Sequence, residues 1–600
     1  MSAPLTDLPR ATELDGTYPR PQLVRRNHAD LTGTWRFAIG DDGASRLTGV
    51  REFDRDIVVP YPPESPASGV HETGFLPVVW YGRTLTADDL AAAGFRGDGD
   101  RAILHFGAVD YIADVWLDGQ HLGRHEGGQT PFSFEVTHLV AAAGEHRLVV
   151  RAQDDPRDVT QPRGKQDWRE QPTEIWYERT TGIWQPVWLE AVAPVHVRRL
   201  AWTPDVPGRA IDLLAEIDGW TRGDDAQLTV RLALGDETLT VQSVQVLDTE
   251  VRLRLALAVQ ENGQQHEKLL WSPEYPQLID AEVVLIDAVG RRDEIASYLG
   301  LRSVAIDHGR FLLNDRPFFV RSVLEQGYWP DTHLAASAET LRREVELIKE
   351  SGFNSARIHQ KAEDPRFLYW CDRLGLTIWG ETANAYAFSP RAVQRLIAEW
   401  TDLVRRDHSH PSIITWVPLN ESWGVQHGPQ STAQQQYTRA LAALTRTLDP
   451  SRPVVSNDGW EHTDSDLLTV HDYASTGAEL AARYDTRELL ARVLDDMGPA
   501  GRRLWLEGAP ASDIPVMLTE FGGVKYTEGD DAGWGYSVAT DAADFERRLR
   551  DIMDAVKGSE LLSGFCYTQF TDTRQEVNGV LREDRTPKLP FETLREIFGR

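Results

Sequence analysis

From about residue 303 onward the chain alternates short apolar runs with helix-like stretches, and this alternation limits the possible folds more than any other feature. One predicted helix carries Leu341, Val345 and Ile348 on a single face, with Gly352 placed to end it. Strands that alternate with helices build a parallel sheet, because each helix returns the chain to the starting edge. The chain from 303 to 600 has the size of a (β/α)8 TIM barrel. The eight strand candidates are 318–320, 353–358, 376–379, 413–419, 454–456, 467–470, 516–519 and 565–570.

The chain before residue 303 reads as two all-β units. Short strand-like runs at 101–106, 112–117 and 146–151 are separated by turn signals such as Asp118-Gly119. Runs at 226–232 and 251–255 alternate apolar and polar residues, as half-buried strands do. We therefore predict three domains. They are a jelly-roll β-sandwich of the sugar-binding type at 1–195, an immunoglobulin-like β-sandwich at 196–302, and the barrel at 303–600.

Composition narrows the partners and the compartment. The formal net charge of −29 argues against nucleic acid, whose phosphates require a basic surface, and against anionic membranes. No apolar run approaches the ~20 residues of a membrane span, and the N-terminus lacks the pattern of a secretory signal. The only cysteines, Cys371 and Cys566, have no metal-like spacing. These observations favour a cytoplasmic protein without a cofactor or metal.

Two glutamates stand where apolar runs end. Glu421 follows the strand candidate at 413–419, and Glu520 follows the one at 516–519. A single glutamate after a strand is ordinarily a solvated loop residue. In a barrel, however, these two positions fall at the C-terminal ends of strands four and seven, where barrel enzymes place their chemistry. Two facing carboxyl groups are the equipment for cleaving a glycosidic bond, and 19 tryptophans lean toward carbohydrate as well.

Longer sequence motifs indicate which protein family the chain resembles. The barrel carries Asn420-Glu421-Ser422 and Thr519-Glu520-Phe521-Gly522. The N-terminal third carries blocks at 18–22, 31–37, 58–65, 113–119, 122–128 and 179–189. Together these motifs resemble glycoside hydrolase family 2, the family of β-galactosidases, β-glucuronidases and β-mannosidases. The resemblance covers nearly the whole chain.

The resemblance implies roles for several residues. Glu421 would be the acid/base, Glu520 the nucleophile, and Asn420 the partner of the sugar 2-hydroxyl. Arg357 matches an arginine that holds the nucleophile ionised, since a guanidinium lowers the pKa of a neighbouring carboxyl group. Tyr473 stands where related barrels keep an aromatic residue near the nucleophile, with packing as the alternative.

Other positions depart from the family pattern. The segment Arg357-Ile358-His359-Gln360-Lys361 replaces the usual Arg-x-Ser-His-Tyr-Pro, so His359 is a substrate contact by position only. The loop after the first barrel strand is unusual as well, and we expect sugar contacts there or a packed aromatic loop. The remaining substrate candidates are Glu325, Gln326, Tyr328 and Trp329 in that loop, and Trp460 after strand five.

The expected function is a retaining exo-β-glycosidase that removes terminal non-reducing sugars, with a β-galactoside-like sugar leading. A β-galactofuranosidase or arabinosidase is an alternative, because the loops after strands one and two are atypical. A β-glucuronidase is another, although Asn578-Gly579-Val580 lacks the lysine of the Asn-x-Lys element found in those enzymes. The alternative from a different class is a non-catalytic carbohydrate-binding protein. Expected partners are a β-glycoside and, from the resemblance, further copies of the chain in a homo-oligomer.

Overall fold

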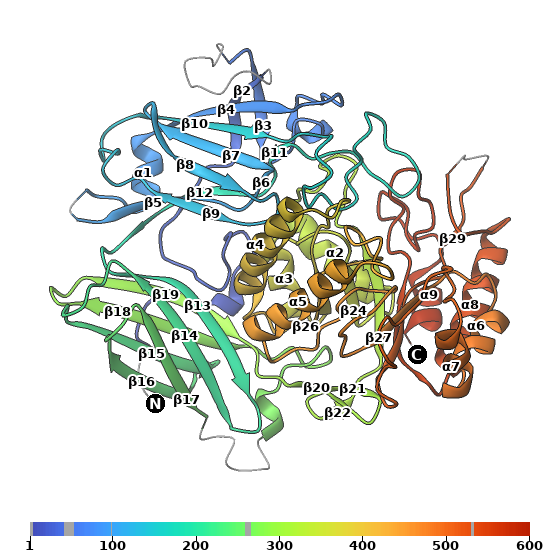
Figure 1. Cartoon of the computed structure of the whole chain (residues 1–600). Coiled ribbons are helices and arrows are strands. Elements are labelled where there is room, and N and C mark those ends of the chain that lie inside the picture. The colour runs from blue at the N-terminus through green and yellow to red at the C-terminus, as the bar shows by residue number, and fades with distance from the viewer. Residues whose placement is uncertain (1–3, 41–52, 98, 258–265, 530–532, 600) are drawn as a thin grey trace.

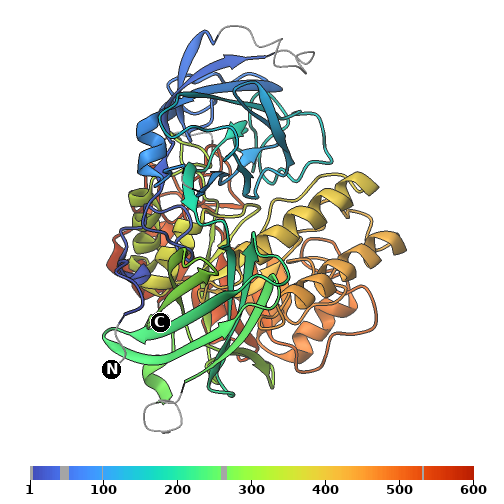
Figure 2. The same cartoon turned by 90° about the vertical axis from the view of Figure 1, so that its left-hand side faces the viewer.

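The computed structural model describes residues 4–40, 53–97, 99–257, 266–529 and 533–599 (Figure 1). Two β-sandwiches stand one above the other, and the parallel barrel lies beside both of them (Figures 1 and 2). The predicted fold class is therefore confirmed, whereas the domain limits at 195 and 302 stay a prediction. None of the described helices is both long enough and apolar enough to cross a membrane.

The first sandwich packs a four-stranded sheet against a six-stranded one, and both are antiparallel. The smaller sheet has the order β1 (Ala29–Asp30), β12 (Val187–Val192), β5 (Arg101–Phe106) and β9 (Phe132–Glu135). The larger has the order β3 (Arg55–Val59), β2 (Gly33–Ile39), β4 (Val78–Leu85), β10 (His146–Gln153), β7 (Ile112–Leu117) and β8 (Gln120–Glu126). The small pair β6 (Val109–Asp110) and β11 (Gly182–Ile183) and helix α1 (Ala87–Ala92) complete the unit. Fully buried side chains such as Trp35, Leu104 and Val115 form its core.

The second sandwich is smaller and also antiparallel. One sheet has the order β13 (His196–Asp205), β14 (Ala210–Asp218) and β17 (Glu250–Ala256). The other has the order β16 (Glu237–Gln245), β15 (Ala226–Leu234), β18 (Ile279–Asp287) and β19 (Arg292–Leu299). Strand β17 alternates exposed and buried residues along its whole length, which is the pattern its sequence predicts.

The barrel strands are parallel and follow one another around the ring. Their order is β26 (Ile413–Val417), β25 (Thr377–Glu381), β24 (Ser355–Ile358), β23 (Val320–Glu325), β31 (Leu562–Tyr567), β28 (Val516–Phe521) and β27 (Leu468–Asp472). The fifth predicted strand is present only as parallel bridges, which join Val454 to Trp416 and Asp458 to Asn420. The covering helices are α2 (Ala338–Glu350), α3 (Pro365–Leu374), α4 (Pro390–Asp407), α5 (Thr432–Leu448), α6 (Gly477–Tyr484), α7 (Arg487–Asp495), α8 (Ala542–Gly558) and α9 (Phe591–Phe598).

Local sequence explains where several of these elements begin. The side chain of Ser337 accepts a hydrogen bond from the Thr340 N–H and so caps α2. The first barrel strand was predicted too early, at 318–320, because an apolar run does not reveal its partner. The N–H of Phe318 instead pairs with the Phe311 carbonyl. Phe318 thus lies beside a small antiparallel sheet of β20 (Val304–Asp307), β21 (Arg310–Leu313) and β22 (Arg316–Pro317).

The connection from β10 to β11 reaches across to the barrel. We call residues 161–180 the rim loop. The N–H groups of Arg163 and Gly164 both donate to the Asn384 carbonyl at 3.1 Å. Gly164 has φ +62°, and a Cβ there would lie 2.1 Å from the Gln360 carbonyl oxygen, so only glycine allows this approach. The first sandwich therefore contributes side chains to the C-terminal rim of the barrel.

A buried ion network joins the two sandwiches. Glu190 accepts hydrogen bonds from Arg25 Nη1 at 3.0 Å and from the Tyr18 hydroxyl at 2.7 Å. Arg25 also donates through Nε to Asp293 Oδ1 at 2.8 Å. The side chain of Glu190 is fully buried and that of Arg25 is 6% exposed, so neither charge can turn to solvent.

Glu190→Ala is expected to lower the free energy of unfolding by about 3 kcal/mol, because it leaves the buried Arg25 short of a partner. The midpoint of thermal unfolding, followed by circular dichroism, measures the effect. Glu13→Ala is the matched control, since Glu13 forms only an exposed pair with Arg10 and should change stability by less than about 1 kcal/mol. Equal midpoints for the two variants would contradict the stabilising role of the network.

Candidate active site

The two predicted glutamates are held by different parts of the barrel. Glu520 lies within strand β28 and is 5% exposed. Glu421 lies in the turn that follows β26, with a left-handed backbone at φ 50°. Its N–H donates to the Asp458 carbonyl at 3.0 Å, and the next N–H, of Ser422, donates to Asn457 Oδ1 at 2.8 Å. These bonds fix a backbone conformation that few non-glycine residues adopt, and so they fix the direction of the Glu421 side chain.

The side chains of Glu421 and Glu520 converge, as the sequence predicts. One oxygen of each carboxyl group and one ring nitrogen of His471 all lie within 4.8 Å of one another. Retaining glycosidases keep their two carboxyl groups about 5–5.5 Å apart, whereas inverting enzymes need about 6.5–9.5 Å to admit a water. The spacing therefore matches the retaining geometry.

Arg357 is the centre of the surrounding charges and has no exposed surface. Its Nη1 lies 3.0 Å from Glu520 Oε1 and 2.9 Å from Asp458 Oδ2. Its Nε donates to Glu381 Oε2 at 2.8 Å, and its Nη2 donates to Asn420 Oδ1 at 2.6 Å. The Arg357 guanidinium, on β24, therefore contacts side chains on β25 and β28. It also contacts one side chain in the turn after β26 and one in the segment after Val454.

The two catalytic candidates have pKa values shifted in opposite directions. Burial would raise the pKa of Glu520, but the charges of His471 and Arg357 outweigh it and lower that pKa. Burial, with the negative charge of Glu520 next, raises the pKa of Glu421. An ionised Glu520 beside a protonated Glu421 is the pair that a nucleophile and a general acid require.

His471 is a site residue that the sequence analysis missed. Its Nδ1 lies 2.8 Å from Glu421 Oε1, and its Nε2 lies 2.9 Å from Asp458 Oδ2. Burial would lower the pKa of His471, but the charges of Glu520 and Asp458 raise it to about 10. The sequence signal that could have identified His471 is the two-residue period of a β-strand. His471 and Tyr473 are two positions apart, so their side chains share a face.

The cluster of Glu421, His471 and Glu520 has the spacing of a metal site. A protonated imidazole, however, has no free lone pair for a metal ion. The raised pKa of His471 therefore favours an ion-paired hydrogen-bond cluster as the interpretation of this spacing.

Three further predicted residues lie around the pair. The hydroxyl of Tyr473 donates to Glu520 Oε2 at 2.6 Å. Among the described residues Asn420 Nδ2 has no hydrogen-bond partner although it is buried, so it is free to donate to a sugar hydroxyl. His359 lies with Nδ1 3.3 Å from Arg357 Nη2, and burial together with the Arg357 charge holds its pKa well below the usual range. His359 is therefore a neutral ring, and its Nδ1 accepts from Arg357.

The other predicted substrate residues have partners other than the two carboxyl groups. Gln326 Nε2 donates to Gln569 Oε1 at 2.6 Å. Burial, with the charge of Glu344 next, raises the pKa of Glu325 to about 8. Lys361 Nζ lies 5.3 Å from the ring centroid of Trp329, and the Arg502 guanidinium lies 4.8 Å from that of Trp460. The contact with Lys361, in the segment after β24, places Trp329 among packed side chains. The Tyr328 hydroxyl donates to Glu178 of the rim loop at 2.6 Å.

A second polar group, also missed, continues from Gln326. Gln569 Nε2 donates to Asn578 Oδ1 at 2.8 Å, and Asn578 Nδ2 donates to Glu576 Oε1 at 3.2 Å. Lys165, from the rim loop, donates to Glu576 Oε2 at 3.0 Å, and both of these side chains are 4% exposed. Burial and the charge of Arg357 lower the pKa of His359 most, and the charge of Lys165 lowers it as well. Lys165 therefore lies near the site. Lys165 and Glu576 thus form a buried ion pair at the end of this polar group.

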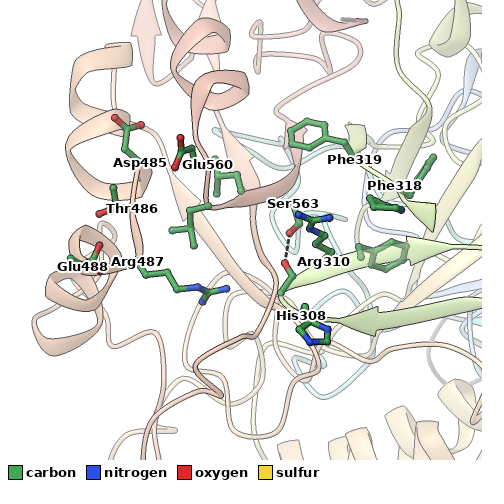
Figure 3. A pocket seen from close by; sticks show the side chains of 15 residues that line it. His308, Arg310, Phe318, Phe319, Asp485, Thr486, Arg487, Glu488, Glu560 and Ser563 are labelled. Carbon is green, nitrogen blue, oxygen red and sulfur yellow. Dashed lines mark hydrogen bonds between the residues drawn. The ribbon is translucent and has the colours of Figure 1, made fainter. Parts of the chain in front are cut away.

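A cavity at the other end of the barrel is separate from this site (Figure 3). Residues 308–311, 317–319, 485–488 and 560–563 line it. It lies at the starts of β23 and β31, which is the N-terminal end of the barrel, and Ser563 Oγ donates to the Gly309 carbonyl at 2.9 Å there. Residues at that end of a barrel ordinarily serve stability.

His471→Gln is expected to move both limbs of the pH profile of kcat/KM upward by about one pH unit. The cationic imidazole favours the ionised form of both glutamates, so its loss raises the pKa of Glu520, which sets the acid limb, and of Glu421, which sets the alkaline limb. His462→Gln is the control, because His462 is buried with a pKa of about 4 and is neutral. Unmoved limbs in His471→Gln would contradict the charge assigned to His471.

A buried carboxyl pair at the C-terminal end of a (β/α)8 barrel defines the class of glycoside hydrolases. Two family models match the chain. They are "Glycosyl hydrolases family 2, sugar binding domain" over residues 57–161 and "Glycosyl hydrolases family 2, TIM barrel domain" over residues 304–491. The chain belongs to glycosyl hydrolase family 2.

Relatives in this family differ in the sugar that their names carry. A β-glucuronidase of Canis lupus familiaris is 26% identical over 519 residues, which cover 76% of this chain and 73% of that protein. A β-galactosidase of Thermoanaerobacter pseudethanolicus is 24% identical over 387 residues, which cover 63% of this chain, and the chain spans about half (48%) of its length. The structure of a β-galacturonidase from Eisenbergiella tayi bound to galacturonate has a TM-score of 0.74 at 22% identity and covers 96% of this chain and 98% of that one. At that identity the structural likeness speaks for the fold alone.

Proposed function

We propose that the chain is a retaining exo-β-glycosidase in which Glu520 is the nucleophile and Glu421 the acid/base. A carboxylate oxygen of Glu520 bonds to the anomeric carbon while the glycosidic C–O bond breaks, and Glu421 gives its proton to the departing oxygen. Water then attacks the glycosyl–Glu520 ester, Glu421 takes the water proton, and the sugar leaves with its configuration kept. The observation that carries the proposal is the convergence of the two carboxyl groups within 4.8 Å.

The charge balance supports this division of roles. Glu421 Oε1 accepts from His471, which leaves Oε2 to carry the transferable proton. Bond formation at Glu520 removes the negative charge that helps to raise the pKa of Glu421. The pKa of Glu421 then falls, and the same group can act as the base in the second step.

A β-galactoside-like sugar is the leading substrate. Val580 is fully buried at the position where the related β-glucuronidases carry a lysine for the sugar carboxylate. Asn578, Glu576 and Lys165 form a polar cluster nearby, and the charges of Glu576 and Lys165 already satisfy each other. Because these two charges cancel, the cluster favours a sugar with hydroxyl groups over one with a carboxylate.

A β-uronide is the second candidate, and Lys165 is the observation that favours it. A sugar carboxylate could replace Glu576 as the partner of this buried cation. The name of the Canis protein points in the same direction.

Initial rates on nitrophenyl β-glycosides decide between these candidates. The leading proposal expects kcat/KM for the β-galactopyranoside to exceed the values for the galacturonide, glucuronide, galactofuranoside and arabinoside by at least about 10-fold, and the first product observed by NMR to be the β-anomer. A preferred uronide whose turnover falls in Lys165→Met more than galactoside turnover does would establish the second candidate. A preferred furanoside would contradict both. Binding without turnover across the whole panel would indicate a carbohydrate-binding protein instead.

A further inference from the structure

Four aromatic side chains form a continuous cluster at the barrel rim. Trp168 and Trp176 come from the rim loop, Tyr386 from the loop after β25, and Trp423 from the turn that holds Glu421. The ring centroids of Trp168 and Trp176 lie 5.1 Å apart, and those of Trp176 and Trp423 lie 5.0 Å apart. Tyr386 lies 5.3 Å from Trp168 and 5.8 Å from Trp423, measured between ring centroids. The first sandwich and the barrel thus build one aromatic surface together.

This surface is rigid but incompletely covered. Trp168 is 36% exposed, with the Arg169 guanidinium 4.7 Å from its ring centroid, and the other three rings are half-buried. The Tyr386 hydroxyl donates to the Gln166 carbonyl at 2.7 Å, and Gln575 Nε2 donates to the Trp176 carbonyl at 2.7 Å, so the backbone behind the rings is tied down. Exposed aromatic faces that are fixed in advance lose little entropy when a ligand stacks on them.

The position of the cluster relative to Glu421 decides which part of a substrate it meets. The Trp423 N–H donates to the Asn420 carbonyl at 2.9 Å, so Trp423 shares a tight turn with the acid/base. The Glu421 side chain is 18% exposed and that of Glu520 is 7% exposed, so the acid lies on the outer side of the pair. A general acid must reach the glycosidic oxygen, and therefore the leaving group lies on its side of the site.

We infer that Trp168, Trp176, Tyr386 and Trp423 form the subsite for the leaving group, and that this subsite takes a flat apolar face. An aromatic ring and the C–H face of a second sugar both offer such a face. The inference rests on the proposed hydrolase activity, and it extends that activity to the part of the substrate beyond the cleaved bond.

The test compares one glycone with three leaving groups: methyl, 4-nitrophenyl and a second sugar. Trp168→Ala is the informative variant, because Trp168 is the most exposed ring and forms no part of the ion cluster. Loss of one stacking partner is expected to lower kcat/KM for the nitrophenyl glycoside or the disaccharide about 3- to 10-fold relative to the methyl glycoside. Trp168→Phe should restore most of that ratio, and Tyr275→Ala, which removes a ring that is 78% exposed in the second sandwich, should leave it at the wild-type value.

Each outcome has a separate meaning. A loss confined to the nitrophenyl glycoside supports the subsite and identifies an aromatic leaving group, and a loss confined to the disaccharide supports it and identifies a sugar. Equal losses on all three substrates, or no loss on any, would overturn the inference. Wild-type protein that cleaves none of the three would instead overturn the proposed hydrolase activity.

Discussion

The buried guanidinium of Arg357 is the interaction on which the site depends. It contacts Glu520, Asp458 and Glu381 with no exposure to solvent, so the charges around it must nearly cancel. Arg357 and His471 supply two positive charges, and the ionised Glu520 and Asp458 supply two negative ones. Burial raises the pKa of Glu381 to about 7 and that of Glu421 above its usual range. The balance is thus best when Glu421 keeps its proton, which is the state in which a general acid must begin.

The barrel and the first sandwich contribute different side chains to the site. The barrel supplies every member of the ion cluster, because the ends of its parallel strands meet at one rim. The first sandwich supplies Lys165, Trp168 and Trp176 through the rim loop, whose close approach depends on Gly164. On the proposed function, Lys165 would lie near the glycone and the two tryptophans near the leaving group, so both would act on substrate selection. Variation in this one loop could therefore change specificity without disturbing the catalytic charges.

Much of the fold and part of the site could be predicted because the signals are local. Strand and helix periodicity located the barrel, and the motifs around Glu421, Glu520 and Arg357 named side chains that the structure brings together. Other features depend on long-range packing. The Lys165–Glu576 pair joins residues 411 positions apart, and no local pattern announces it. Trp329 was predicted as a sugar contact or a packed loop residue from its place in an atypical loop, and the sequence did not show that Lys361 and Arg585 lie over its ring. Composition could not reveal which aromatic residues reach the rim.

The most direct test of the account is to trap the covalent intermediate. A 2-deoxy-2-fluoro β-glycoside of the preferred sugar with a good leaving group should inactivate the enzyme. The fluorine slows both steps, because both pass through oxocarbenium-like transition states, but the good leaving group speeds the first step alone, so the glycosyl–Glu520 ester accumulates. Peptide mass spectrometry should then find one fluorosugar on Glu520 and none on Glu421. A label on any other residue, or turnover that inverts the anomeric centre without a trapped ester, would contradict the retaining mechanism and the roles of the two carboxyl groups.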